Sequence, residues 1–84
     1  MNTIKYQKRA VKQLSKLPDN VSATIVQACD VLKHFPDCPN IKHLTKHQYS
    51  YRFRVGIYRV FFEFDGVVKI VWIEEIRKRD ESTY

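Results

Sequence analysis

Three arginines interrupt a run of aromatic and β-branched residues in the segment YRFRVGIYR, which begins at residue 51: Arg52, Arg54 and Arg59. A two-residue hairpin turn that starts at Gly56, where glycine supplies the positive φ of the first turn position, would place Arg54 directly opposite Arg59. Arg52 would lie on the same face of the sheet. Directly opposed like charges destabilise a sheet by up to about 1 kcal/mol. We therefore expect an anion to bind this cluster, and phosphate suits the guanidinium fork.

The same register also allows internal salt bridges. Glu63 would lie close to Arg52, and Glu74, on the next strand, would reach Arg59 diagonally. Most charge clusters on small proteins are solvated faces, and their ion pairs contribute little to stability. The residues alone leave the anion-binding and the salt-bridge interpretations both open.

The composition sets limits on the size of the protein and on its partners. The chain has 84 residues, the size of one domain with a single small core, so residues 1–84 are predicted to form one domain. Fifteen Lys and Arg against nine Asp and Glu give a formal net charge of +6, which favours nucleic acid, an anionic membrane or an acidic protein as partner. No stretch approaches the roughly 20 apolar residues of a membrane span, and the N-terminus lacks the apolar segment of a signal peptide. We expect a cytoplasmic protein without a membrane partner.

The cysteines and histidines do not predict a metal centre. Cys29 lies in a helical apolar pattern and Cys38 in a loop flanked by prolines, so both are predicted to be free thiols. The separations between Cys38, His43 and His47 match no standard zinc pattern. We expect neither a metal ion nor another cofactor.

Hydrophobic periodicity and the positions of Pro and Gly predict the elements that carry the arginines. Pro18 and Pro36 end two segments with apolar residues at helical spacing, the first of which is also basic. The predicted order is strand, helix, helix and three strands: residues 3–6, 7–17, 19–35, 49–55, 58–64 and 67–75. The expected fold class is α+β: an N-terminal strand, a two-helix hairpin and a three-strand antiparallel meander, forming a small curved sheet with the helices on one face.

An Asp-Gly dipeptide follows the second strand of the predicted meander and favours another two-residue turn. This turn would place Phe64 opposite Val67 and, further along, Arg59 opposite Trp72. Phe61 would share the face of the arginines. Trp72 is therefore a candidate for stacking on a nucleobase, although core packing explains a single Trp at least as often. Phe61 is a further candidate contact to RNA.

Two segments carry a resemblance to a known family: YRFRVGIYRVFF at residues 51–62 and RKRDESTY at residues 77–84. Together with the predicted order of elements, they resemble the RelE/ParE superfamily of toxins from bacterial type II toxin–antitoxin modules. The resemblance implies a small α+β toxin whose helix pair packs on one side of a curved sheet. It also implies a cognate antitoxin with an acidic toxin-binding segment, which wraps and neutralises the toxin in a hetero-oligomer.

Within the superfamily, the chain is most similar to the RelE-like branch, which cleaves mRNA in the ribosomal A site and so inhibits translation. The resemblance implies a ribosome-dependent endoribonuclease, with mRNA and ribosomal RNA as partners, and four catalytic residues: Arg54, Arg59, Arg79 and Tyr84. Arg52 would hold a neighbouring phosphate. Because arginine cannot lose its proton in a protein, the general base must be another group. Tyr84 is the first candidate, and His43 and His47 are alternative proton carriers.

Three further expectations depend on the geometry. Strict alternation from Trp72 would put Lys78 on the arginine face, so Arg79 reaches that face only if the last strand ends or bulges near Glu75. Lys78 is therefore an alternative phosphate contact. The basic residues of the first helix either contact ribosomal RNA or are ordinary solubilising charges: Lys8, Arg9 and Lys12.

Two other functions remain open at this point. The ParE-like branch of the superfamily poisons DNA gyrase and has no enzymatic activity of its own. An inactive module that retains only antitoxin binding is the third hypothesis.

Overall fold

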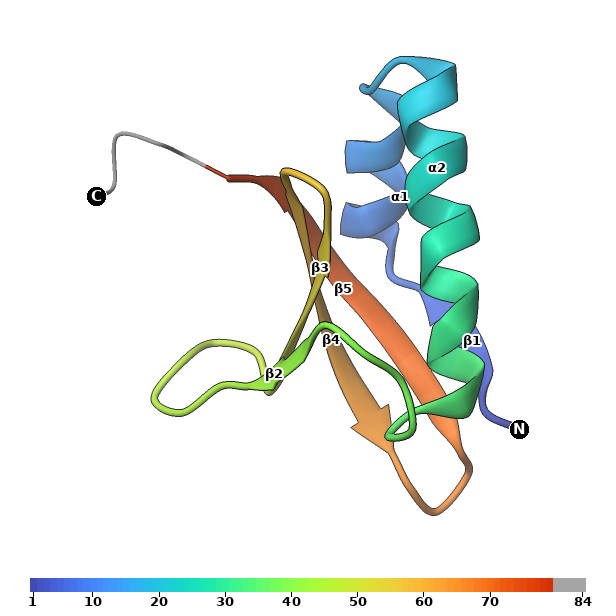
Figure 1. Cartoon of the computed structure of the whole chain (residues 1–84), viewed down its shortest axis with the longest axis vertical. Coiled ribbons are helices and arrows are strands. Elements are labelled where there is room, and N and C mark those ends of the chain that lie inside the picture. Colours follow the sequence, from blue (N-terminus) through green and yellow to red (C-terminus); the bar gives the residue numbers. More distant parts are fainter. Residues whose placement is uncertain (80–84) are drawn as a thin grey trace.

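The structure is a computed structural model that describes residues 1–79 of the chain. Two helices lie side by side on one face of a curved sheet, so the predicted α+β class is confirmed (Figure 1). The elements follow in this order: β1 (Thr3–Tyr6), α1 (Lys8–Ser15), α2 (Asp19–Cys29), a 3₁₀ turn η1 (Asp30–His34), β2 (Ile41–His43), β3 (Tyr51–Val55), β4 (Tyr58–Asp65) and β5 (Ile70–Lys78). No helix within residues 1–79 is long and apolar enough to cross a membrane.

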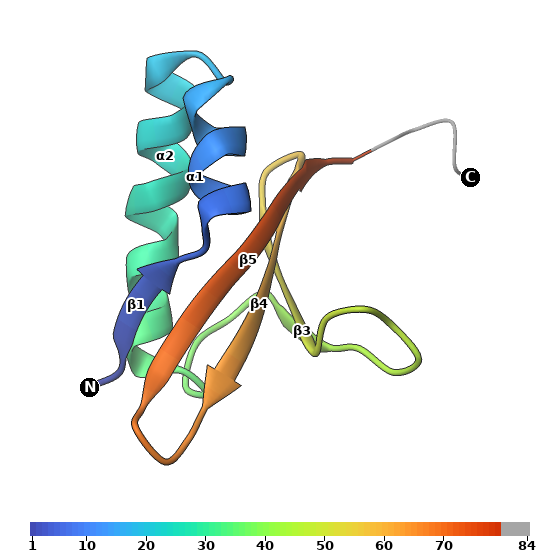
Figure 2. The ribbon, with the colours of Figure 1, turned by 180° about the vertical axis from the view of Figure 1, so that it is seen from behind.

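The sheet has five strands in the order β1-β5-β4-β3-β2. Strand β1 is parallel to β5 and lies beside it in the view from behind, whereas all the other pairs are antiparallel (Figure 2). The short edge strand β2 was not predicted, because its only apolar residue is Ile41. It forms because Ile41 pairs with the buried Phe53 of β3.

The core lies between the helices and one face of the sheet. Ala10 is the buried residue of α1, and α2 contributes Ile25 and Cys29. The second predicted helix is shorter than expected, because the chain tightens into η1 after Cys29 before it reaches Pro36. The sheet residues of the core alternate along their strands with residues of the opposite face: Phe53, Val60, Phe62, Val71, Ile73 and Ile76.

The first hairpin has the predicted register. Arg54 pairs with Arg59, and Arg52 pairs with Phe61 on the same face. Gly56 has a φ of 57°, which a type II′ turn requires at its first central position. Local turn chemistry therefore fixes the position of the arginines.

The second hairpin differs from the prediction. Its loop spans four residues, 66–69, so that Asp65 pairs with Ile70 and Phe64 pairs with Val71. The predicted pairs of Phe64 with Val67 and of Arg59 with Trp72 were wrong. The reason is the Asp65 carboxylate, which accepts hydrogen bonds from the backbone N–H groups of both residues that follow Gly66 and so closes a longer loop.

Strand β5 contains a β-bulge. The register with β4 shifts between Phe61 and Phe62, because Ile73 pairs with Phe62 whereas Glu75 pairs with Phe61. The extra residue of β5 reverses the alternation of the residues that follow it. The bulge on which the placement of Arg79 depended is therefore confirmed.

Candidate functional site

The face of the sheet opposite the helices carries most of the arginines, and we call it the arginine face. Two rows of directly paired residues cross it from β3 through β4 to β5. The first row holds three arginines: Arg54, Arg59 and Arg77. The second row holds Arg52, Phe61 and Glu75. Hence the bulge brings a third arginine into line with the pair that the first hairpin sets.

A hollow of about 90 Å³ lies on this face beside the first hairpin turn. Four arginines from three parts of the chain line it, together with residues 56–58: Arg52, Arg54, Arg59 and Arg79. The backbone N–H of Arg79 donates a hydrogen bond of 2.7 Å to the carbonyl of Ile57, which holds the chain after β5 against the turn. The structure thus brings together the four arginines that were predicted from the sequence as site residues. The fifth predicted residue of the site, Tyr84, lies outside the described residues.

The alternative prediction was a salt bridge of Glu63 with Arg52 and one of Glu74 with Arg59, and neither forms within residues 1–79. A carboxylate oxygen of Glu63 accepts a hydrogen bond from the backbone N–H of Ser50 at 3.0 Å, and a carboxylate oxygen of Glu74 accepts one from the Gln7 side chain at 3.3 Å. Among residues 1–79, no acidic side chain forms an ion pair with Arg52 or Arg54. Within the described part of the chain, Arg52 and Arg54 therefore have no carboxylate partner, and their charge favours an anionic ligand.

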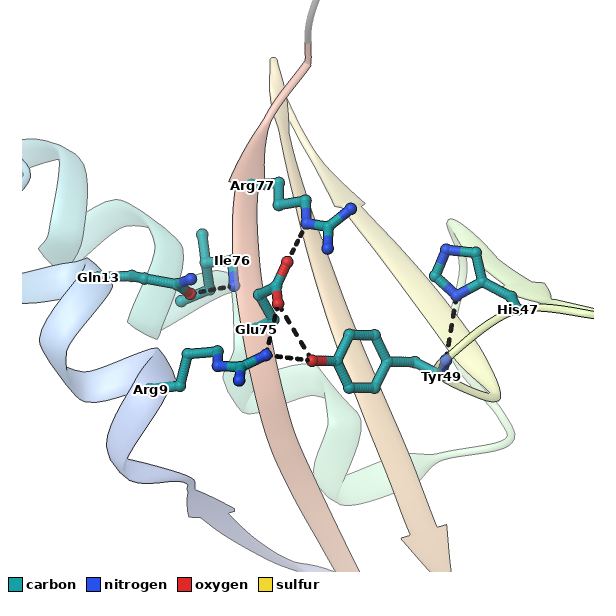
Figure 3. Close-up of polar contacts among 7 residues, drawn as sticks. All are labelled: Arg9, Gln13, His47, Tyr49, Glu75, Ile76 and Arg77. Carbon is teal, nitrogen blue, oxygen red and sulfur yellow. Dashed lines mark hydrogen bonds and ion pairs between the residues drawn. The ribbon is translucent and has the colours of Figure 1, made fainter.

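A buried carboxylate organises the second row of the arginine face (Figure 3). Glu75 is only 5 % exposed, and its Oε1 accepts hydrogen bonds from Arg9 Nη1 at 3.0 Å and from the Tyr49 hydroxyl at 3.1 Å. Its Oε2 accepts a hydrogen bond from Nε of Arg77. Two guanidinium groups and a hydroxyl thus satisfy this carboxylate, as burial of a charge requires.

Helix α1 reaches this carboxylate because the edge of β5 is open there. Strand β1 pairs only with residues 70–73, so the later part of β5 has no neighbouring strand on that side. Gln13 of α1 closes the edge, since its Oε1 accepts a hydrogen bond of 2.6 Å from the backbone N–H of Ile76 (Figure 3). Arg9, which the sequence left as either an RNA contact or a solubilising charge, is held by Glu75 and Tyr49.

The loop before β3 covers the centre of the arginine face. The ring of His47 stacks on that of Phe61, with centroids 5.2 Å apart and an interplanar angle of 14°. Its Nδ1 accepts a hydrogen bond of 3.0 Å from the backbone N–H of Tyr49, whose ring also contacts Phe61. Phe61 is only 4 % exposed. The ring of Phe61, a predicted RNA contact, is therefore covered by His47 and Tyr49 in this structure.

The other predicted contacts lie away from the hollow. Trp72 pairs with Glu63, four residues along β4 from Arg59, and the Lys5 ammonium lies 5.7 Å from its ring centroid. His43 lies on the edge strand β2, opposite Tyr51. Two lysines of α1 are exposed on the helix surface: Lys8 and Lys12.

Lys78 does not lie on the arginine face, contrary to the expectation from strict alternation. It pairs with Tyr58, next to the pair formed by Arg77 and Arg59, and so lies on the opposite face of the sheet. The bulge causes this reversal, because it exchanges the faces of all later residues of β5. Arg77 and Glu75, which the sequence did not single out, occupy the arginine face instead.

Neither cysteine is among the residues that line the hollow. Both cysteines are free thiols, and burial raises the pKa of Cys29 to about 11. Burial also raises the pKa of Cys38. Among residues 1–79, no group of three His, Cys, Asp or Glu side chains is placed to hold a metal ion.

Comparison with known proteins agrees with this architecture. Residues 4–83 match the family model described as the ParE toxin of the type II toxin–antitoxin system parDE. No curated protein matches the chain.

Several solved toxin structures share the fold. The toxin–antitoxin complex RelBE2 from Mycobacterium tuberculosis is 25 % identical, with a TM-score of 0.80 over 93 % of this chain and 98 % of that chain. The archaeal RelE–RelB complex from Pyrococcus horikoshii is 24 % identical, with a TM-score of 0.76 over 95 % and 97 %. The isolated Escherichia coli RelE toxin is 17 % identical, with a TM-score of 0.77 over 96 % and 87 %. The chain therefore belongs to the ParE toxin family of type II toxin–antitoxin systems, within the RelE/ParE superfamily.

Proposed function

We propose that this toxin is a ribosome-dependent endoribonuclease that cuts mRNA in the ribosomal A site and thereby inhibits translation. The observation that carries the proposal is the hollow in which four arginines converge. Phosphodiester cleavage has to stabilise extra negative charge in the transition state, and converging guanidinium groups are suited to this task. The structural relatives named RelE point in the same direction.

The reaction would begin with attack of the RNA's own 2′-hydroxyl on the adjacent phosphorus. Arg54 and Arg59, which face each other across the hairpin, would hold the non-bridging oxygens of the scissile phosphate. Arg52 would bind a neighbouring phosphate, and Arg79 would stabilise the leaving 5′-oxygen. These contacts supply alignment of the attacking group and neutralisation of charge.

The proton of the 2′-hydroxyl needs a separate acceptor, since arginine cannot act as a base. His47 is poorly suited, because its Nδ1 already accepts the Tyr49 N–H, so that the neutral ring carries its own proton on Nε2. Tyr84 stays the first candidate for this role. Guanidinium groups favour the phenolate form of a tyrosine that binds beside them.

Inhibition of DNA gyrase is the second candidate function. The observation in its favour is the family model itself, which describes a ParE toxin. In that case the arginine face would serve for binding alone. A cognate antitoxin with an acidic toxin-binding segment is the expected partner under both proposals.

Induction of the chain in a bacterial host, followed by mapping of transcript ends, separates the two functions. Codon-phased cuts within translated messages are expected for the nuclease. A DNA-damage response with intact messages would contradict the nuclease and favour the gyrase inhibitor.

A further inference from the structure

Arg77 continues the row of opposed arginines beyond the hollow. It pairs directly with Arg59, which pairs directly with Arg54. Neighbouring strands lie about 4.8 Å apart, so the row crosses about 10 Å of the sheet. The residues that line the hollow do not include Arg77. The arginine face therefore offers a cation beside the hollow, on the side of β5.

The Arg77 side chain is held in one orientation by two contacts. Its Nε donates to the buried carboxylate of Glu75 (Figure 3). Its guanidinium carbon lies 5.4 Å from the ring centroid of Phe61. The side chain is 53 % exposed, and no group within residues 1–79 accepts a hydrogen bond from its Nη atoms. A fixed fork of N–H groups therefore remains available to an incoming ligand.

The ion pair with Glu75 leaves positive charge in this part of the face. One carboxylate is shared by two guanidinium groups, those of Arg9 and Arg77. The group of three side chains keeps a net charge of one positive unit. The Tyr49 hydroxyl further occupies Oε1 and ties the carboxylate to the loop before β3. Glu75 thus orients Arg77 without cancelling the charge of the cluster.

We propose that Arg77 binds a backbone phosphate of the RNA next to the scissile one, and that Glu75 is the positioning residue for this contact. The inference rests on the proposed nuclease function. In this arrangement Arg54 and Arg59 hold the scissile phosphate, whereas Arg77 fixes the strand that leads away from it over β5. The ligand class is a single-stranded RNA backbone, and the recognition depends on charge.

Neutral linkages in the message test this contact directly. Ribosomes are programmed with a defined mRNA in which one phosphate at a time, on either side of the cleavage site, is replaced by a methylphosphonate. Single-turnover cleavage by the native chain should fall about tenfold to a hundredfold at one flanking linkage, the loss expected for a charged hydrogen bond. Arg77→Gln should cleave the unmodified message more slowly by a similar factor. It should also be insensitive to the neutral linkage at that position.

Matched variants separate this role from a structural one. Lys69→Gln removes a charge from the β4–β5 turn, at the other end of β5, and should behave as the native chain does. Glu75→Gln should show a reduced sensitivity to the same linkage, whereas its antitoxin complex still forms. If Arg77→Gln keeps the native sensitivity at every linkage, the inference is overturned while the nuclease function stands. Failure of the native chain to cleave any message would instead overturn the proposed function and this inference with it.

Discussion

Arg54 lies directly opposite Arg59 across the first hairpin, in a pair that places two guanidinium groups on the same face of the sheet. One further pair, Val55 with Tyr58, separates it from the turn, where Gly56 has a positive φ of 57°. Opposed like charges are unfavourable in a sheet. The arrangement is therefore easier to understand as a device for binding an anion than as a contribution to stability.

Removal of one charge from this pair should not destabilise the protein. Arg54→Gln keeps the stem of the side chain and removes the repulsion with Arg59, so the free energy of unfolding should stay the same or rise by up to about 1 kcal/mol. Urea unfolding at low ionic strength measures the difference, which added salt should reduce. A loss of more than about 1 kcal/mol would show that Arg54 is mainly a structural residue.

Loss of the buried carboxylate should have the opposite effect. Glu75→Ala leaves two guanidinium groups and the Tyr49 hydroxyl without their shared acceptor, and we expect a loss of about 1–3 kcal/mol in the free energy of unfolding. Glu74→Ala is the matched control, because the one hydrogen bond that this neighbour forms within residues 1–79 is with the Gln7 side chain. Its cost should stay below about 1 kcal/mol. Equal losses for the two variants would argue against an organising role for Glu75.

The hairpin turn gives a test of backbone strain. Gly56→Ala should cost about 1 kcal/mol, because an L-residue is strained at a φ of 57°. The strain is local, since within residues 1–79 no atom beyond the two chain neighbours lies within 4 Å of the added Cβ. Gly66→Ala is the control, since its φ is not positive and the nearest side-chain atom lies 3.4 Å away. Thermal melts of the two variants check the difference. A similar stability for both would mean that the first turn tolerates another conformation.

The alkaline side of the stability profile should depend on a buried thiol. Burial raises the pKa of Cys29 from 9.0 to about 11, so folding favours the neutral thiol. This contribution is complete below about pH 9 and is lost as the pH rises toward 11, with a maximum of about 3 kcal/mol. Burial also raises the pKa of Tyr6, which acts in the same direction.

Urea unfolding under reducing conditions from pH 7 to pH 11 measures this decline. Cys29→Ala lowers the stability at neutral pH because it removes buried atoms, but its decline between pH 9 and 11 should be smaller than that of the native chain. Parallel curves for the two proteins would contradict the assignment to Cys29.

The sequence predicted the parts of the fold that local chemistry controls. The first hairpin follows from Gly56 and from the alternation of the strands around it, so the register of Arg54 with Arg59 could be counted correctly. The Asp-Gly dipeptide was misleading, since the Asp65 side chain bonds two backbone N–H groups and a four-residue loop results. Competition between side chain and backbone of this kind is not visible in a turn propensity.

The bulge explains most of what was missed at the candidate site. A spacing of three between the buried residues Ile73 and Ile76, in place of two, was the signal in the sequence that could have revealed it. With the bulge in place, Arg77 and Glu75 join the arginine face, whereas Lys78 leaves it. The contact of Glu75 with Arg9 spans 66 positions and depends on the open edge of β5, which no local pattern indicates.

Cleavage of a ribosome-bound message by purified protein tests the central claim most directly. With ribosomes that hold a defined codon in the A site, the native chain should cut the message, and a 2′-deoxy substitution at the attacking nucleotide should prevent the cut. Arg54→Gln and Arg59→Gln should each lower the single-turnover rate about 10²–10³-fold, as loss of a charge-stabilising group does in other enzymes. The antitoxin complex of both variants should form as before, and Lys69→Gln should cleave at the native rate. Native cleavage rates in both arginine variants, or an intact message with the native chain, would contradict the account.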